Sequence, residues 1–396
     1  MSQLNVKKNS VQPDQIYFDL TSTNFQSLTV PPAPFYFNEQ RSNPFVMNPE
    51  EYYLSIIRFT VDTGTIPVFI PSIVPNSSNR NETIYSTTLS WVGALGEYHS
   101  QVSIIWSPQD FEAVIPPPPS QNATKIQDNT TGYYNCYSYQ YFCYLVFVAL
   151  QTAFVELRTL AIDEGETTFP TTHSPILNWD STANRAVIYA DMNGYDINML
   201  DGAVQPVRIW FNSALYGLFS SFPARYNGYS ALYGENFGLL IANVGATNLQ
   251  TIIPESPAVQ YEAIVFNQEW TTTSSWSPIT ALVFTSNTLP IQPSQVSQPV
   301  VFNNGVLVNG GGNNSAVSNI VTDITSDTGL YSPNLVYIPQ AQYRYITLYG
   351  NQPLYNLDIS IFYRLKTGQL IPFRLQSGGC VTMKLAFIKK DSIGVK

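Results

Sequence analysis

The sequence predicts an all-β protein: an antiparallel jelly-roll β-sandwich with an inserted domain that contains a helix. Two observations predict the sandwich. Short runs rich in Val, Ile, Tyr, Phe and Thr recur along the chain, and clusters of Asn, Gly, Pro and Ser separate them at fairly regular intervals. Many short strands between turn signals are typical of a sandwich or jelly roll, not of a parallel α/β sheet. A third observation, one long segment without Gly or Pro, predicts the helix.

The chain is expected to divide into three parts. Residues 1–14 predict a flexible N-terminal arm. The jelly-roll domain is expected over 15–75 and 185–396, so that the N- and C-terminal parts of the chain build one sandwich. The inserted domain is expected over 76–184.

The strands follow from local patterns. The strongest lies at 52–61, where most positions on both faces are apolar. Near the C-terminus, strands at 357–364 and 370–375 flank a turn with Gly368, and Gly378 precedes a last strand. Further strands are expected at 83–91, 102–106, 186–190, 207–211, 238–244, 261–270, 281–285, 319–324, 343–348 and 382–388.

The helix is predicted over 137–160, inside the insertion. A long apolar stretch there is followed by Gln151, Glu156 and Arg158, which are spaced for one polar helical face. Four consecutive prolines at 116–119 cannot lie inside a sheet and indicate a stiff connector upstream.

The composition favours a protein that buries much of its outside against neighbours. Only 11% of the 396 residues are charged, whereas 14% are aromatic and 26 are Tyr. Protein–protein interfaces favour Tyr and Trp over Lys and Glu. The net charge of −9 argues against nucleic-acid binding across the whole surface. Basic residues gather at the two ends, where contact with a polyanion stays open beside the favoured alternative of solvated tails: Lys7, Lys8, Lys384, Lys389, Lys390 and Lys396.

No catalytic, cofactor-binding or metal-binding residue is predicted, and the chain is not expected to be an enzyme. The two histidines, His99 and His173, have no GxSxG elbow to serve. The acidic residues near 163–166 lack the alternating pattern of a calcium loop, and the three Cys have no zinc-finger spacing. Paired carboxylates brought together by folding stay open as a glycosidase alternative.

The N-terminus lacks the apolar region of a signal peptide, which predicts that the chain is made inside a cell and not secreted. The longest apolar run, at 142–150, is too short to cross a bilayer, so no membrane insertion is expected.

Four segments carry a family resemblance. They are NEQRSNP (38–44) with NPEEYYLSIIRF (48–59) and IPVFIP (66–71); FNSALYGLFSSFP (211–223); QEW (268–270) with SWSP (275–278) and 279–290; and 343–345 through DISIFY (358–363) to SGGC (377–380). Together they resemble the penton or minor capsid proteins of polinton-like viruses, virophages and adintoviruses.

The resemblance implies a structural capsid protein of the virion. It implies a jelly-roll subunit that forms homopentamers at the vertices of an icosahedral double-stranded DNA virus, against a double jelly-roll major capsid protein. The insertion would face outward, and the basic termini would be candidates for contact with the viral DNA. Two alternatives stay open: a double jelly-roll major capsid protein, and a β-sandwich carbohydrate-binding protein or glycosidase.

Four residues are candidates for interface or structural roles: Arg41, Arg58, Arg344 and Trp276. Arg58 and Arg344 lie within apolar strand motifs, where a charge is costly unless it is paired. We hypothesise that these two arginines tie loops or neighbouring subunits together.

Overall fold

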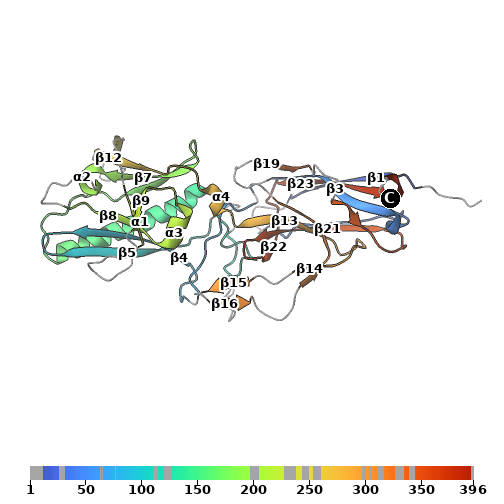
Figure 1. The fold of residues 1–396 in the computed structure, drawn as a ribbon, viewed down its shortest axis with the longest axis horizontal. Helices are drawn as coiled ribbons and strands as arrows, with labels where there is room; N and C mark the ends of the chain where they lie inside the picture. Colours follow the sequence, from blue (N-terminus) through green and yellow to red (C-terminus); the bar gives the residue numbers. More distant parts are fainter. Residues whose placement is uncertain are drawn as a thin grey trace, which may run out of the picture.

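The computed structural model describes residues 12–25, 32–62, 64, 66–75, 77–109, 115–119, 127–196, 205–226, 238–242, 249–252, 260–296, 300–303, 306–309, 316–325, 334–338 and 344–393. Figure 1 shows two β-rich lobes arranged end to end. We call them the terminal lobe, built from both ends of the chain, and the inserted lobe, built from its middle. Most of the predicted flexible arm, 1–14, lies outside the described residues.

The terminal lobe is a jelly roll of two facing antiparallel sheets. One sheet has the order β1-β23-β3-β19 and the other β18-β13-β21-β2; β20 also pairs with β3, and β22 with β21. The bounds are β1 (Gln15–Thr23), β2 (Tyr36–Gln40), β3 (Tyr52–Asp62), β13 (Ile279–Thr285), β18 (Ile320–Ile324), β19 (Asn334–Tyr337), β20 (Ile346–Thr347), β21 (Asn356–Leu365), β22 (Leu370–Pro372) and β23 (Cys380–Lys389). Numbered along the chain, the eight main strands stand in the orders 1-8-3-6 and 5-4-7-2, in which the first and last strands lie side by side. The predicted fold class is confirmed.

Alternating apolar side chains form the core between these sheets. In β1 only Phe18 and Leu20 are buried, because an edge strand covers the core with one face. Across the core, the rings of Phe59 from β3 and Phe284 from β13 meet edge to face at 4.9 Å. The two sheets therefore share one hydrophobic core, distinct from that of the inserted lobe.

The inserted lobe also has two antiparallel sheets, with the orders β5-β4-β8-β10-β9 and β11-β12-β7-β6. The strands are β4 (Glu82–Val92), β5 (Glu97–Ile105), β6 (Ile176–Asp180), β7 (Arg185–Asp191), β8 (Arg208–Phe211), β9 (Ala224–Tyr226), β10 (Leu239–Ile241), β11 (Leu249–Ile252) and β12 (Tyr261–Asn267). The helices are α1 (Tyr139–Asp163), α2 (Met192–Tyr195), α3 (Ser213–Leu218) and α4 (Thr273–Trp276). This strand order is not that of a second jelly roll, so the structure contains a single one among the described residues.

Helix α1 confirms the predicted helix with slightly later bounds. It packs against β4, β5 and β6, and its buried residues include Phe142, Leu150 and Leu157. Gly165, just past its end, has φ +96, a conformation that favours glycine. Within the described part of the chain, α1 alone is long and apolar enough to cross a membrane by length and composition. Because the core helix of a water-soluble domain meets the same criteria, the absence of membrane insertion stays a prediction.

The predicted bounds of the insertion, 76–184, are too narrow. Strands β7, β8 and β12 pair and pack with α1 in the inserted lobe, and not with the jelly roll. The insertion fills the connection between β3 and β13, so it extends to about Trp276 instead of ending at 184. The strand patterns look alike in both lobes, and a local pattern does not say which sheet a strand joins.

Two short paired segments complete the connection between β13 and β18. β14 (Ser294–Val296) pairs with β17 (Ala316–Ser318), and β15 (Val300–Asn303) pairs with β16 (Val306–Asn309). Two 3-10 helices, η1 (Pro49–Glu51) and η4 (Lys390–Ile393), flank the strands at one end of the terminal lobe.

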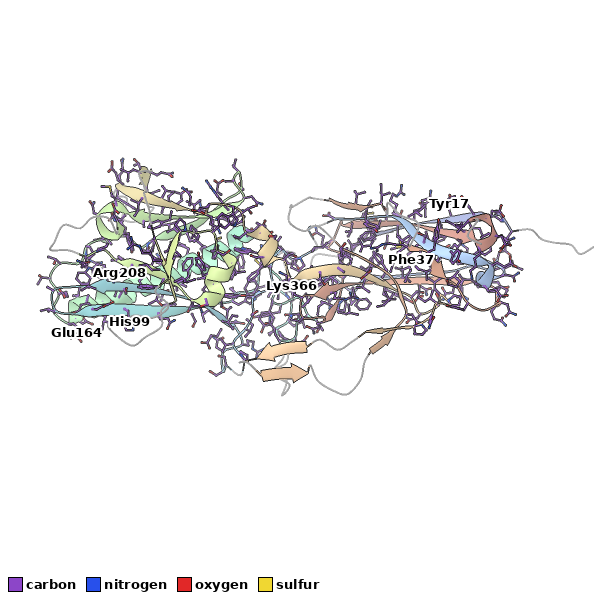
Figure 2. All side chains as sticks on the ribbon, in the orientation of Figure 1. Tyr17, Phe37, His99, Glu164, Arg208 and Lys366 are labelled. Atoms are coloured by element: carbon purple, nitrogen blue, oxygen red, sulfur yellow. The ribbon has the colours of Figure 1, made fainter. Side chains whose placement is uncertain are left out.

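Polar contacts join the two lobes at their junction, where Figure 2 labels Lys366. The Lys366 side chain donates to the Ser275 carbonyl at 3.1 Å, and its backbone N–H donates to the Pro278 carbonyl at 2.8 Å. The guanidinium of Arg374 donates to the carbonyls of Pro32, at 2.6 Å, and Thr130, at 3.3 Å. The contacts with Ser275 and Pro278 connect the jelly roll to the end of the insertion, and the contact with Thr130 connects it to the segment before α1, whereas Pro32 belongs to the jelly roll itself.

Candidate assembly surfaces

A row of charged side chains crosses the outer face of the sheet that contains β1, β23 and β3. Asp19, Lys384 and Arg58 stand opposite one another in register on the three neighbouring strands. The Asp19 carboxylate lies 3.5 Å from Arg58 Nη2 and 3.6 Å from Lys384 Nζ. Lys384 Nζ also lies 5.0 Å from the centre of the Tyr17 ring. Figure 2 labels Tyr17 on this part of the terminal lobe.

Arg58 is thus paired, but it is not embedded in apolar surroundings as its sequence context suggests. Its side chain is 50% exposed, next to an irregularity in the pairing of β3 with β23. The irregularity matters because one extra residue in a strand changes which face the following side chains occupy. The pairing described here lies within one chain; a contact between Arg58 and a neighbouring subunit stays a prediction.

We expect Asp19→Asn to lower the free energy of unfolding by less than about 1 kcal/mol, because Asp19 and Arg58 are solvent-exposed, Lys384 is only half-buried, and water and salt screen such pairs. Denaturant unfolding at low and high salt checks this, and the difference from wild type should shrink as salt rises. Glu39→Gln, which removes the exposed partner of Arg41, is the matched control. A loss above about 2 kcal/mol would show that the row is desolvated.

The end of the terminal lobe opposite the insertion carries the described ends of the chain. There the Lys389 backbone N–H donates to the Asp14 carbonyl at 2.8 Å, and Lys389 Nζ lies 3.7 Å from a Glu51 carboxylate oxygen. Lys390 Nζ lies 5.3 Å from the centre of the Tyr53 ring. Figure 1 marks the C-terminus at this end, far from the inserted lobe. We call this end the base.

Arg41 and Arg344 both join segments within the chain. Arg41 Nε lies 2.5 Å from Glu39 Oε1, and its guanidinium lies over the Phe45 ring at 4.6 Å. Arg344 donates to the Asp323 carbonyl in β18, and its guanidinium lies 5.8 Å from the Tyr337 ring in β19. Arg344 thus contacts two strands of its own chain, and its hypothesised role in tying loops or neighbouring subunits together stays a prediction.

Trp276 lies in the interior of the inserted lobe, with 2% of its surface exposed. The centre of its indole ring lies 5.4, 5.5 and 5.1 Å from the centres of the phenyl rings of Phe69, Phe142 and Phe219. Its N–H donates to the Leu218 carbonyl at 2.8 Å. Trp276 therefore acts through packing inside one chain, and its buried ring offers no surface to a neighbouring subunit.

The sequence reasoning did not single out Asp358, which is 1% exposed in β21. Its carboxylate accepts hydrogen bonds from the hydroxyls of Ser286 and Thr288, at 2.6 and 2.7 Å, and from the backbone N–H groups of Asn287 and Thr288. Burial acts to raise the pKa of Asp358, but these hydrogen bonds outweigh it, so that the pKa is lowered. An acidic residue between the apolar residues Leu357 and Ile359 was the available signal.

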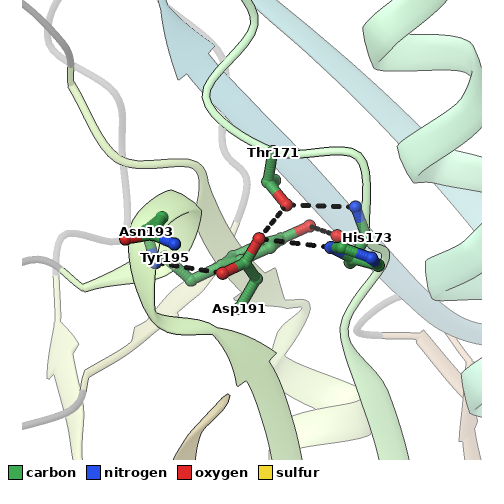
Figure 3. A network of polar contacts seen from close by, with 5 residues as sticks. All are labelled: Thr171, His173, Asp191, Asn193 and Tyr195. Atoms are coloured by element: carbon green, nitrogen blue, oxygen red, sulfur yellow. Dashed lines mark hydrogen bonds and ion pairs between the residues drawn. The ribbon is translucent and has the colours of Figure 1, made fainter. Parts of the chain in front are cut away.

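One polar network in the inserted lobe contains an acid, an imidazole and a hydroxyl, the residue types of a hydrolase (Figure 3). Asp191 Oδ2 accepts from the Thr171 hydroxyl at 2.6 Å and lies 3.3 Å from His173 Nδ1. The Thr171 hydroxyl thus bonds the carboxylate and not the imidazole, while His173 stacks on Tyr261 with ring centres 4.1 Å apart. A hydrolase needs the hydroxyl on the imidazole instead. The network holds a loop to β7 and α2, and the geometry does not position a nucleophile.

The acidic segment after α1 is not arranged as a cation site. Glu166 is buried, and its Oε1 accepts from the Leu95 backbone N–H at 2.7 Å and from the Tyr98 hydroxyl at 3.4 Å. Across the described part of the chain, no group of three or more His, Cys, Asp or Glu side chains could hold a metal ion. The described cysteines are free thiols, and burial raises the pKa of Cys136 to about 12, which makes it an unreactive core residue.

Comparison with known proteins gives one consistent result along nearly the whole chain. The family described as Sputnik minor capsid protein V18/19 matches residues 16–389. Two proteins of Sputnik virophage match parts of it: "Uncharacterized protein V18" is 35% identical over 161 residues, which is 40% of this chain and 92% of V18. "Structural protein V19" is 25% identical over 215 residues, which is 54% of this chain and 93% of V19.

Two solved structures share the fold. A chain of the cryo-EM structure of the Sputnik virophage superposes with a TM-score of 0.76 at 26% identity, over 96% of this chain and 99% of the other. The mavirus penton protein superposes with a TM-score of 0.56 at 13% identity, over 95% and 100% of the two chains, and this likeness shows the fold alone.

Proposed function

Because this chain belongs to the family of the Sputnik minor capsid protein V18/19 and is a structural protein of the virion capsid, we propose that it is the penton subunit, which forms homopentamers at the five-fold vertices of the shell. The observation that carries the proposal is the match of the whole chain, both lobes included, to a chain of the Sputnik virion at 26% identity. The shared fold with a penton protein adds support.

The single jelly roll favours a vertex subunit over the double jelly-roll alternative. The inserted lobe has its own sheet order and its own core, so it does not supply the second roll that a double jelly-roll major capsid protein requires. The major capsid protein is then the expected partner around the pentamer. A protein whose work is assembly needs no catalytic centre, and we propose that the chain is not an enzyme.

The two ends of the molecule suggest its orientation in the shell. We propose that the base faces the particle interior and that the inserted lobe projects outward. Contact of the basic termini with viral DNA stays a prediction, because Lys7, Lys8 and Lys396 lie outside the described residues. Lys384, Lys389 and Lys390 already have partners within the terminal lobe, which leaves them less available to phosphates.

Mass photometry and negative-stain imaging of the purified full chain test the proposal. We expect closed rings of about five times the 44.2 kDa chain mass, since a cyclic assembly closes on itself. Trimers would favour the double jelly-roll alternative. A chain that stays monomeric at high concentration, or that binds or hydrolyses glycans as a monomer, would overturn the proposal in favour of the carbohydrate-binding alternative.

A further inference from the structure

Helix α1 buries one side in the inserted lobe and leaves an apolar row on the other. Four apolar side chains in this row are exposed: Tyr144 at 54%, Val148 at 38%, Val155 at 58% and Ile162 at 50%. The row runs along most of the helix and faces away from the core residues that α1 packs against β4, β5 and β6. An isolated exposed apolar residue needs no explanation, but a continuous row indicates a contact surface.

The spacing of this row is that of a coiled-coil seam. Together with two exposed polar residues, Gln151 and Arg158, the four residues form the series 144, 148, 151, 155, 158 and 162, with alternating steps of four and three. This is the heptad repeat of positions a and d. Val148, Val155 and Ile162 then occupy the a positions, where β-branched residues are common in coiled coils, and Tyr144, Gln151 and Arg158 occupy the d positions. The seam is thus matched to another helix.

The charges of α1 also favour a partner like itself. From Tyr139 to Val155 the helix contains no Asp, Glu, Lys, Arg or His. The first acidic residue, Glu156, is engaged by the Ser100 hydroxyl at 2.6 Å. Because each copy of the chain carries a net charge of −9, copies approach best through a surface with little charge, and Arg158 is the one charged residue of the row.

We propose that the row Tyr144, Val148, Gln151, Val155, Arg158 and Ile162 faces the rotation axis of the assembly and packs against the same row of neighbouring copies of this chain, in parallel and in register. The occupant is a second α1 because α1 is the one long helix among the described residues. The inference rests on the proposed function and adds a contact between the inserted lobes of neighbouring copies.

The direction of α1 in the molecule makes the arrangement parallel. The helix starts at the lobe junction, where the Tyr139 ring contacts Trp276 at 5.3 Å, and it ends near the free tip, where Figure 2 labels Glu164. It therefore extends along the length of the molecule (Figure 1). Rotation about an axis in that direction keeps the helix direction, so equal residues of two copies meet at equal heights. Gln151 of one copy then faces Gln151 of another copy. The long side chain of Arg158 can place its guanidinium at the solvent-exposed edge of the seam.

Cysteine cross-linking in the assembled full chain tests the arrangement. Ile162→Cys and Val148→Cys are made separately in a Cys380→Ser background, since the other two cysteines are buried. Both should form disulfides between copies on mild oxidation. Leu160→Cys is the matched control, because Leu160 is apolar, 42% exposed and off the seam on the same helix. An antiparallel contact would bring residue 162 near the other helix start, so that Ile162→Cys would not cross-link, and the inference would be wrong.

Charge substitution provides a second readout. Val155→Glu should raise the concentration at which the assembly dissociates by at least about tenfold, whereas Leu160→Glu should leave it within about twofold of wild type. Circular dichroism confirms that both variants fold. Flotation with phosphatidylcholine vesicles tests a lipid occupant, and wild-type binding that Val155→Glu abolishes would overturn the inference.

The outcomes separate the inference from the proposed function. Pentamers that form without any cross-link through 148 or 162 would overturn the seam and leave the penton proposal standing. Oligomers of another symmetry that do cross-link at both positions would support the seam and overturn the pentamer. A chain that stays monomeric at high concentration and does not cross-link would overturn both.

Discussion

Replacing Trp276 with alanine is expected to lower the free energy of unfolding of the inserted lobe by about 4 kcal/mol. The indole is almost fully buried, and its ring contacts reach the segment that enters the lobe, the start of α1 and the end of α3. Removing the indole leaves a cavity that the surrounding aromatic side chains cannot fill. The loss of stability is largest where the neighbouring side chains cannot move into the cavity. Denaturant unfolding followed by circular dichroism measures the loss.

Trp270→Ala is the matched control, because Trp270 is 58% exposed and lies six residues before Trp276 in the chain. We expect it to change the free energy of unfolding by less than about 0.5 kcal/mol. Trp276→Phe should fall between the two, since it keeps most of the volume and loses the hydrogen bond to Leu218. Equal losses for both alanine variants would show that Trp276 does not organise this core.

Asp358→Ala is expected to lower the free energy of unfolding by about 3 kcal/mol. The substitution removes an acceptor and leaves the buried hydroxyl of Ser286 and the N–H groups of Asn287 and Thr288 without it. These donors belong to the segment that follows β13, so the carboxylate on β21 fixes the first turn of the connection from β13 to β18. Asp323→Ala is the control, because the Asp323 side chain is 48% exposed and only pairs with Arg364 at 3.5 Å; it should cost less than about 1 kcal/mol.

The Asp358 pKa also fixes the sign of a pH effect. Because the folded pKa lies below the unfolded value of about 3.9, folding is favoured while the carboxylate is ionised. This stabilisation is present in full above the unfolded pKa and is lost as pH falls through the folded pKa. Wild type should therefore lose stability more steeply below about pH 4 than Asp358→Asn does. If the free energies of unfolding of wild type and Asp358→Asn fell in parallel below about pH 4, the lowered pKa of Asp358 would be contradicted.

Much of the jelly roll was predictable from the sequence, because its central strands are long and rich in apolar side chains. β3 and β23 lie inside a sheet and bury apolar side chains along most of their length, which a local pattern detects. β1 and β2 lie at sheet edges and are half polar, so no strand was assigned to them. The end of the insertion was placed too early, because membership in a sheet depends on contacts distant in sequence.

The candidate residues show the same limit. Arg58 has apolar neighbours in the sequence, yet the irregularity beside it leaves the guanidinium in solvent. Trp276 was singled out through a family motif, and the motif alone did not say that the ring lies inside a core. The seam on α1 requires knowledge of which helix face is buried, since apolar residues cover nearly every side of its first half. Patterns identify candidates, and packing assigns their roles.

The contact between Phe69 and Trp276 has a consequence for how the chain folds. Phe69 lies where the chain enters the inserted lobe and Trp276 where it leaves, so the folded insert returns the polypeptide to its point of departure. An unfolded insert would impose the entropy of closing a very long loop on the pairing of early and late strands. A folded insert instead connects the early and late strands as a short turn would. The inserted lobe is therefore expected to fold first, and the two sheets of the jelly roll to pair afterwards.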